Sequence, residues 1–172
     1  MMKKSLSYGF LLLSVLLHYS VNAEPEVLGW LESAYIKPWD IKVRAKLDTG
    51  ARTSSLHATD IETYQINDAT WVRFTLTQPG SKNGNQPEKK ITVERPLIKE
   101  TKIKEHLGDS MLRNVVEMKF CLNGRNYITP VTLADRTNFH YPLLLGRRTL
   151  KDNLLIDPGK SFTAKKSCLH KK

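Results

Sequence analysis

The chain has 172 residues, a formal net charge of +10 at pH 7 and 40% hydrophobic residues. A basic surface suits nucleic acid, anionic lipid or acidic peptides, but the basic residues are scattered, without an arginine-rich helix or an aromatic-interleaved basic run, and we expect no nucleic-acid partner. The five histidines are dispersed and the two cysteines lie far apart, which excludes the spaced ligand sets of zinc sites.

The first 23 residues have the pattern of a secretion signal rather than of a folded segment. Lys3 and Lys4 precede an apolar run over residues 9–17, and Val21-Asn22-Ala23 has the small residues of a cleavage site. The run is short for a bilayer span, and an uncleaved anchor is the alternative. We expect an exported protein, periplasmic or secreted, with no stable membrane insertion after cleavage. Residues 24–172 then form a single domain, and loss of the two signal lysines leaves a charge of +8.

The first half of this domain predicts strands separated by turns. Alternating apolar and polar residues indicate strands over 27–36, 41–48, 54–66 (kinked) and 71–76. Pro38-Trp39-Asp40 and Thr49-Gly50 mark turns. Residues 78–90 are polar, with two prolines and two glycines, and predict an exposed loop or hairpin tip.

The second half continues in the same way. Strand character resumes over 89–99, the charged residues 99–113 predict a loop, and Asn123-Gly124 is a hairpin signal. The remaining predicted elements are strands over 115–122, 127–134, 142–146 and 154–157, a loop over 136–141, a short helix over 147–152, a turn at Pro158-Gly159 and a frayed basic tail from about 165. Many short strands with one short helix predict a mainly β fold, a closed or partly closed β-barrel.

Cys121 lies in a predicted strand and Cys168 near the end of the chain. In an exported protein the two can pair and tie the C-terminus to the body of the domain. The sequence leaves open whether their geometry permits the disulfide.

One carboxylate occupies a distinctive position. The strand over 41–48 ends at Asp48, and Thr49-Gly50 follows at once. Asp on a tight turn is often structural, but such a turn also holds a catalytic acid still. The residues alone leave both interpretations open.

A family resemblance favours catalysis. Asp48-Thr49-Gly50-Ala51, with Leu143-Leu144-Leu145-Gly146-Arg147 far downstream, resembles the retropepsin-like aspartic proteases. The longer string from Asp48 through Ala58 is similar to a bacterial branch often labelled ATP-dependent zinc protease, some members of which accompany ATP-grasp glutamate ligases. The resemblance covers residues 28–162. No zinc-ligand set and no phosphate-binding Gly-Lys loop supports that label, so we expect no cofactor, no metal and no ATP.

The resemblance implies a mechanism and a partner. Peptide hydrolysis by carboxylates needs two groups sharing one proton, one as base toward water and the other as donor to the carbonyl oxygen. The chain has one such motif, so the resemblance implies a homodimer in which Asp48 of each copy meets at the two-fold axis. Thr49 would bond across the axis, and Gly50 would permit close approach. Site-supporting or substrate-binding roles fall to Ala51, Arg52, Leu145, Gly146 and Arg147.

Several residues keep alternative roles. Arg52 is either a surface base or a group that binds a substrate carboxylate. His57 is either a packed histidine or a ligand, with packing favoured, and Asp157 is either a structural strand-end residue or a second carboxylate within one chain. Residues 78–90 are the candidate for the flap that closes over substrate in retropepsins, although they are more hydrophilic than such a flap.

The sequence thus predicts an exported retropepsin-like aspartic endopeptidase acting on a peptide or protein substrate, with acidic substrates suggested by the charge. The alternative is a catalytically weak or inactive peptide-binding or envelope-adaptor domain on the same fold. A metallohydrolase, as the family label suggests, is a third hypothesis.

Overall fold

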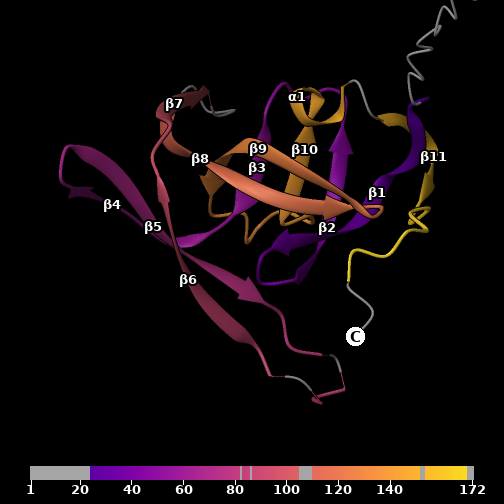
Figure 1. Ribbon diagram of the computed structural model, residues 1–172, viewed down its shortest axis with the longest axis horizontal. Helices are drawn as coiled ribbons and strands as arrows, with labels where there is room; N and C mark the ends of the chain where they lie inside the picture. Colours follow the sequence, from indigo (N-terminus) through magenta and orange to yellow (C-terminus); the bar gives the residue numbers. More distant parts are fainter. Residues whose placement is uncertain (1–23, 82, 86, 105–109, 152–153, 170–172) are drawn as a thin grey trace, which may run out of the picture.

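The computed structural model describes residues 24–81, 83–85, 87–104, 110–151 and 154–169 of the chain. These residues form two β-sheets and one short helix (Figure 1). The predicted signal segment, residues 1–23, lies outside the described residues. No described helix has the length and apolarity needed to cross a membrane.

The larger sheet is a ring of strands with two added edges. Its order is β11-β1-β2-β10-β3-β9-β8-β7, and β1 also pairs with β8, which closes a circuit of six strands. The predicted partly closed, mainly β fold is therefore confirmed. The strands are β1 (Glu26–Lys37), β2 (Ile41–Asp48), β3 (Ser54–His57), β7 (Lys99–Lys104), β8 (Ser110–Leu122), β9 (Arg125–Ala134), β10 (Leu143–Gly146) and β11 (Leu154–Ser161).

The smaller sheet has three antiparallel strands, β4 (Thr59–Ile66), β5 (Ala69–Gln78) and β6 (Lys89–Pro96). It extends away from the ring, so the molecule is elongated in Figure 1. The buried faces of its strands, through residues such as Val72, Phe74 and Val93, join the same hydrophobic core as the ring. The one helix, α1 (Arg147–Leu150), follows β10 directly.

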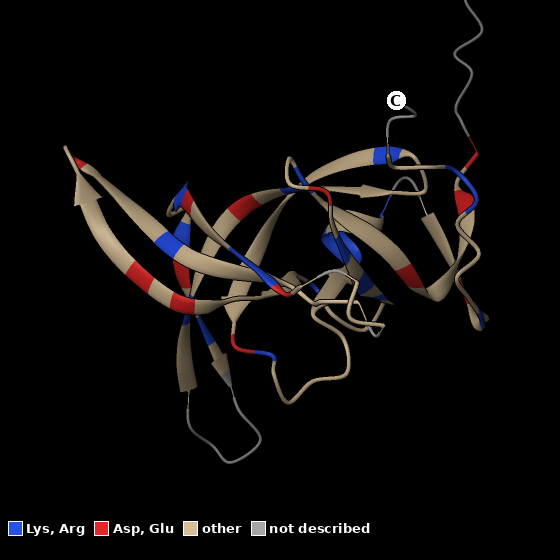
Figure 2. Ribbon diagram, turned by 90° about the horizontal axis from the view of Figure 1, so that it is seen from below, with Lys and Arg blue, Asp and Glu red and all other residues tan. Residues whose placement is uncertain are grey.

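The core forms because the strand periodicity places every second side chain inward. In β2, Ile41, Val43, Ala45 and Leu47 are buried, whereas Lys42 and Arg44 between them are exposed. Leu143 and Leu145 of β10 are fully buried beside them. Basic residues therefore occupy the outside of both sheets rather than one continuous stretch (Figure 2).

One prediction about local structure is wrong, and another holds only locally. Residues 99–113 are not all loop, because β7 pairs antiparallel with the start of β8, from Lys99 opposite Val115 to Lys104 opposite Ser110. β7 is an edge strand, and charged residues on an edge hide the apolar alternation that identifies inner strands. The turn predicted at Pro158-Gly159 is a local irregularity within β11, which continues to Ser161 along β1 with a register shift between Gly29 and Leu31. An edge strand tolerates proline.

The predicted hairpin at Asn123-Gly124 is confirmed. Both residues have positive φ, 47° and 76°, as a tight two-residue turn requires. The turn joins β8 to β9, whose antiparallel pairing runs from Leu122 opposite Arg125 to Val115 opposite Thr132.

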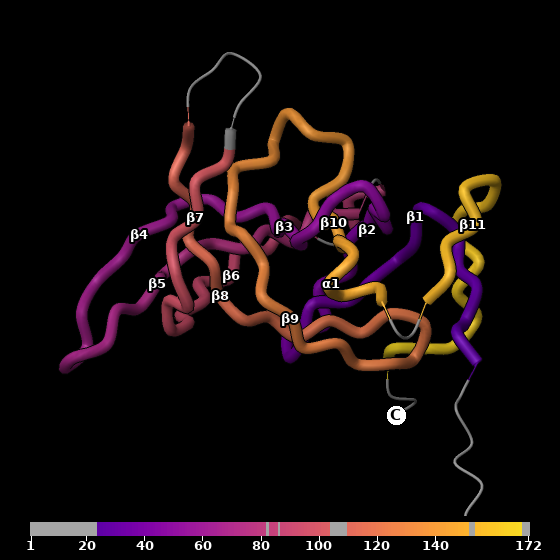
Figure 3. Tube along the Cα trace, turned by 90° about the horizontal axis from the view of Figure 1, so that it is seen from above, coloured from indigo at the N-terminus to yellow at the C-terminus, as the bar shows by residue number. Residues whose placement is uncertain are grey.

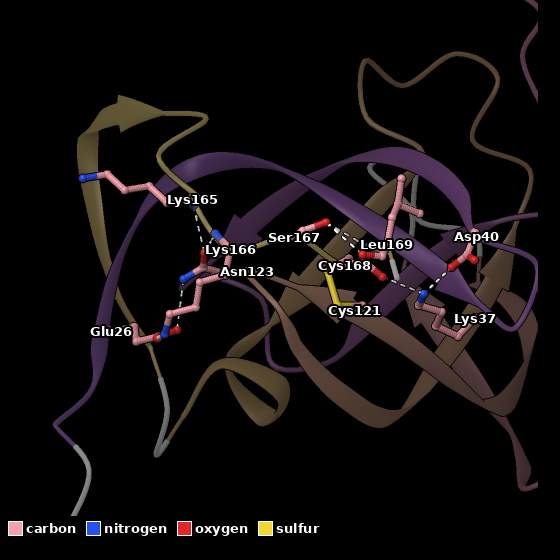
Figure 4. The surroundings of a disulfide bond; sticks show 10 residues. All are labelled: Glu26, Lys37, Asp40, Cys121, Asn123, Lys165, Lys166, Ser167, Cys168 and Leu169. Atoms are coloured by element: carbon pink, nitrogen blue, oxygen red, sulfur yellow. Dashed lines mark hydrogen bonds and ion pairs between the residues drawn. A yellow bond between two sulfur atoms is a disulfide. The ribbon is translucent and has the colours of Figure 1, made fainter. Parts of the chain in front are cut away.

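The segment after β11 is fastened to this hairpin (Figure 4). Cys121 and Cys168 form a disulfide with an S–S distance of 2.11 Å. The side-chain oxygen of Asn123 accepts hydrogen bonds from the backbone N–H groups of Lys165 and Lys166, at 2.9 and 2.8 Å. Residues 165–169, which the sequence assigns to a frayed tail, are thus held to the domain, and residues 170–172 lie outside the described part.

Candidate active site

The candidate site lies where β2 ends. β10 runs parallel to β2, with Leu145 opposite Leu47 and Gly146 opposite Asp48. On its other side β10 pairs antiparallel with β3. The loop over residues 49–53 joins β2 to β3 and therefore passes around the end of β10. Figure 3 shows this loop in purple beside α1.

Hydrogen bonds fix the carboxylate of Asp48 on this loop. Its Oδ1 atom accepts from the backbone N–H of Gly50 at 3.0 Å and of Ala51 at 3.3 Å. Its Oδ2 atom lies 3.0 Å from Nζ of Lys46. The Asp48 side chain keeps 21% of its surface exposed, so the carboxylate is held in place and still reachable.

The surroundings of Asp48 favour the ionised carboxylate. Partial burial pushes its pKa upward, but the hydrogen bonds and charge of Lys46, together with the N–H groups of Gly50 and Ala51, outweigh burial. The net effect lowers the pKa of Asp48 below its ordinary value.

Arg147 stabilises the loop from the helix side. Its Nη1 atom donates to the carbonyl oxygens of Thr49 and Gly50, at 2.8 and 2.9 Å. The backbone N–H of Arg147 donates to the carbonyl of Ala51, and that of Arg148 donates to the carbonyl of Arg52. The first turn of α1 therefore holds four consecutive residues, 49–52, in one conformation.

Gly146 is required by the close approach of two backbone segments. A Cβ atom at this position would lie 2.6 Å from the carbonyl oxygen of Thr53, which is too close for any side chain. The N–H of Gly146 donates to Oγ of Ser54 at 3.1 Å. A buried chain of hydroxyl groups continues from Ser54 to Thr149 (2.7 Å) and on to Thr129 (2.9 Å).

The structure brings together most of the residues that the motif singled out. Asp48, Thr49, Gly50, Ala51 and Arg147 share the hydrogen-bonded loop described above, and Leu145 and Gly146 lie directly behind it. The side chain of Arg52 takes part in no hydrogen bond or ion pair within the described residues; its carbonyl oxygen alone is used.

Two other candidates lie elsewhere. Asp157 uses its carboxylate locally, accepting from Gly159 N–H at 2.9 Å and pairing with Lys160 at 3.0 Å. His57 lies at the end of β3 remote from Ser54, where its Nδ1 atom accepts from the backbone N–H of Arg136 at 2.8 Å. The packed role of His57 is therefore the one that the structure supports.

Residues 78–90 do not lie where a flap over Asp48 is needed. Thr77 and Pro79 line a groove with Lys42, at the opposite end of β2 from Asp48. Six residues of strand separate Lys42 from Asp48, or about 20 Å. The hairpin beside the Asp48 loop is β7–β8 instead: Lys99, Thr101 and Val115 line a cavity of about 300 Å³ with Thr53 and Arg148.

Two features of the site go beyond the sequence predictions. Lys46 is the partner of Asp48, and the signal for this pair is the spacing of two residues, which puts both side chains on one face of a strand. The hydrogen-bonded hydroxyl groups of Ser54, Thr149 and Thr129 leave no pattern in the sequence, because the three residues come from three different elements. In the described ranges, no three His, Cys, Asp or Glu side chains gather as a metal site would require.

A carboxylate held on a glycine turn, backed by a buried strand that ends in Gly-Arg and set in a partly closed β-barrel, defines the retropepsin-like class of aspartic proteases. A family model described as RimB-like, "Retropepsin-like aspartic endopeptidase RimB", matches residues 27–167. The chain belongs to this RimB-like family.

Relatives and a solved structure agree with this assignment. The chain is 33% identical over 119 residues to a protein named "Probable alpha-L-glutamate ligase" from Desulfotalea psychrophila, and 33% identical over 122 residues to one of the same name from Shewanella pealeana. These matches cover 68% and 70% of the chain but 24% and 25% of the relatives, so the chain spans about a quarter of their length.

The fold is also similar to the crystal structure of Lpg0085, a protein of Legionella pneumophila described as having unknown function. The TM-score is 0.67 at 31% sequence identity, and the match covers 83% of this chain and 100% of the other.

Proposed function

We propose that this protein is an aspartic endopeptidase that acts after export, in which Asp48 of two identical copies forms the catalytic dyad. The observation that carries the proposal is the Asp48 loop itself. A carboxylate with two backbone N–H donors on one oxygen, on a loop held by Arg147, is preorganised for a fixed role and still partly exposed.

The reaction needs no group beyond the two carboxyls and water. One ionised Asp48 takes a proton from water, which attacks the peptide carbonyl carbon, while the protonated Asp48 of the second copy donates to the carbonyl oxygen. The proton held on the first carboxyl then passes to the leaving amine as the C–N bond breaks, and the second carboxylate takes a proton back from a hydroxyl of the tetrahedral intermediate as the C=O bond forms again. Two carboxylates within hydrogen-bond distance of each other share one proton and titrate as a pair.

The surface beside Asp48 supports association with a second copy. A shallow hollow of about 240 Å³ is lined by Thr49 and Arg147 and by the apolar Leu150, Leu154 and Leu155. Leu155 is 56% exposed, and β11, which carries it, is the last strand at one edge of the ring. An exposed apolar surface next to an unpaired strand edge favours pairing with another chain.

We further propose that the substrate is an acidic peptide or protein segment. The net charge of +8 that remains after loss of the two signal lysines supports this, since charge of opposite sign raises the rate and strength of encounter. The glutamate ligase name of the relatives agrees with a substrate that contains glutamate.

The test is a comparison of wild type with Asp48→Asn. Wild type should cleave glutamate-containing peptides in a library, and the variant, which keeps the size and the Oδ1 acceptor of Asp48, should not. Sedimentation of wild type over a concentration series should show a dimer, with activity rising as the dimer forms. Equal cleavage by the two proteins would overturn the role of Asp48, and cleavage by a strict monomer would overturn the shared dyad.

A second function is favoured by the ion pair of Asp48 with Lys46. An aspartic dyad needs one protonated carboxyl, and Lys46 favours the ionised form. A non-enzymatic peptide-binding domain on the same fold would keep this ion pair unchanged. That function predicts peptide binding without turnover and a monomer at every concentration, so the same two measurements distinguish it.

A further inference from the structure

A cationic groove lies at the end of β2 remote from Asp48. Its volume is about 390 Å³, and its lining includes Lys42, Arg44, His57, Arg136 and His140. The start of β2, the loop after β9 and the end of β5 form its walls. β10 begins beside this groove and ends at the Asp48 loop, so the two sites lie at opposite ends of the same strands (Figure 1).

Arg136 is the most buried of these cations. Only 8% of the residue is exposed, and its guanidinium lies over the ring of Phe139, with Cζ 4.5 Å from the ring centre. Nε donates to the carbonyl oxygen of Tyr141 at 3.1 Å and Nη1 donates to Oγ of Ser55 at 3.4 Å. These bonds fix the plane of the guanidinium. Of its five N–H groups, the others have no acceptor within the described residues.

Arg44 is fixed at the same groove. Its Nη2 atom donates to the carbonyl oxygen of His140 at 3.3 Å, and its guanidinium lies 5.8 Å from the centre of the Tyr141 ring. Tyr141 is in turn held edge-on by Trp30. Lys42 stands two residues before Arg44 on the same exposed face of β2, about 7 Å away along the strand.

These three cations have no ion-pair partner among the described residues. In the part of the chain that the structure describes, no carboxylate forms an ion pair with Lys42, Arg44 or Arg136. Asp135, the residue before Arg136, lies 3.7 Å from Nδ1 of His57 and directs Oδ1 to the N–H and hydroxyl of Thr137. A buried arginine without an anionic partner is costly, so an external carboxylate bound here would stabilise Arg136.

We propose that this groove is a binding site for the side-chain carboxylates of an acidic peptide, separate from the Asp48 site. Lys42 and Arg44 bind two carboxylates on the same side of an extended chain, and the fixed guanidinium of Arg136 binds another. Neighbouring side chains on the same side of an extended peptide are about 7 Å apart, the same repeat as Lys42 and Arg44 on β2. Binding here needs neither the Asp48 carboxylate nor a second copy of the chain.

The experiment measures binding without turnover, on Asp48→Asn protein. The probes are acetylated, amidated tetraglutamate and the matching tetraglutamine, titrated by calorimetry at 20 and 150 mM NaCl. Tetraglutamate should bind at least tenfold more tightly than tetraglutamine, and more tightly at the lower salt. The added double substitution Lys42→Gln/Arg44→Gln should weaken tetraglutamate binding by about tenfold or more.

A matched control is Lys119→Gln, which removes an exposed lysine from β8 outside this groove. It should leave tetraglutamate binding unchanged. Equal binding of the two probes, or a Lys42→Gln/Arg44→Gln protein that binds as tightly as the Lys119→Gln control, would overturn the site. Arg136→Lys, which keeps the charge but loses the planar fork, should weaken binding by several-fold while circular dichroism stays unchanged; undiminished binding by a folded Arg136→Lys protein would contradict the role of Arg136. Failure of this binding leaves peptide cleavage by Asp48 as a separate question, since cleavage is assayed on wild type.

Discussion

The ammonium of Lys46 lies 3.0 Å from Oδ2 of Asp48, two residues further along the same face of β2. The strand repeat that places Leu47 in the core places both charged groups outside it. The candidate catalytic acid is therefore paired with a cation from its own strand, and this pair favours the ionised form of Asp48.

Lys46→Met should raise the pKa of Asp48. The folded-state pKa is now depressed, so the ion pair stabilises the fold above the unfolded-state pKa, and this contribution is lost as pH falls through the folded-state value. Wild type and Lys46→Met should therefore differ in the free energy of unfolding near neutral pH and converge at acidic pH. In the proposed peptidase, the acidic limb of the activity profile should move to higher pH.

NMR titration of the Asp48 carboxyl carbon measures this shift directly. Lys160→Met is the matched control, because it removes an ion pair of the same 3.0 Å length, with Asp157, on another strand. It should leave the titration of Asp48 in place. An Asp48 titration that is the same in wild type and Lys46→Met would show that Lys46 does not set the pKa.

Gly146→Ala should destabilise the protein. The added Cβ would meet the carbonyl oxygen of Thr53 at 2.6 Å and its carbonyl carbon at 2.7 Å, and both are backbone atoms that cannot rotate away. We expect the free energy of unfolding to fall by about 1–3 kcal/mol, in the range of overpacked cores. Urea unfolding followed by circular dichroism measures the loss.

Gly50→Ala provides the comparison for Gly146→Ala. A Cβ at Gly50 meets only Oδ1 of Asp48, at 3.2 Å, and no backbone atom. The unfolding of Gly50→Ala should stay close to that of wild type while the Asp48 loop is disturbed. A Gly146→Ala protein that unfolds at the same urea concentration as Gly50→Ala would contradict the packing argument.

The local sequence pattern is enough to predict strand β2 and the Asn123-Gly124 turn. The period-two alternation gave the bounds of β2 correctly, residues 41–48, because burial of every second residue is a property of the strand itself. Asn123-Gly124 likewise encodes its own turn through positive φ. The Asp48 loop and its support by Gly146 and Arg147 followed from family resemblance, since the segments that make it are almost 100 residues apart.

Features that depend on pairing between distant strands were not predictable in this way. Residues 99–104 read as a charged loop and become an edge strand only because β8 is available beside them. Composition makes residues 78–90 the candidate flap. Composition does not show, however, that this segment begins at the end of β2 remote from Asp48. The groove around Arg136 draws its cations from a strand and a loop that no local pattern connects.

Glu32→Gln should loosen the segment that follows β11. The Glu32 side chain is fully buried, and its Oε1 atom accepts from Gly29 N–H, Thr163 N–H and the Thr163 hydroxyl at 3.0, 2.8 and 2.7 Å. Its Oε2 atom accepts from Ala164 N–H at 3.1 Å. An amide can accept at one end only, so at least one buried N–H loses its acceptor, at a cost of about 1–3 kcal/mol.

Chemical denaturation measures this cost, and hydrogen exchange at Thr163 and Ala164 locates it. Glu117→Gln, an exposed substitution on β8, is the control and should change neither. Unchanged exchange at Thr163 and Ala164 in Glu32→Gln would mean that the carboxylate does not anchor this segment.

Replacement of both Cys121 and Cys168 by serine should lower the free energy of unfolding. The bridge joins residues 47 apart in sequence, and closure of a loop of this length in the unfolded chain corresponds to about 4 kcal/mol in the chain-entropy model. The bonds of Asn123 to Lys165 and Lys166 remain in the variant, so we expect a folded protein that is about 2–4 kcal/mol less stable. Reductant should bring wild type to the stability of the double variant and leave the variant unchanged, because the disulfide is then the sole difference that reductant removes. A wild type whose unfolding is the same with and without reductant, under conditions where thiol titration shows the bridge to be open, would contradict a stabilising role for this bond.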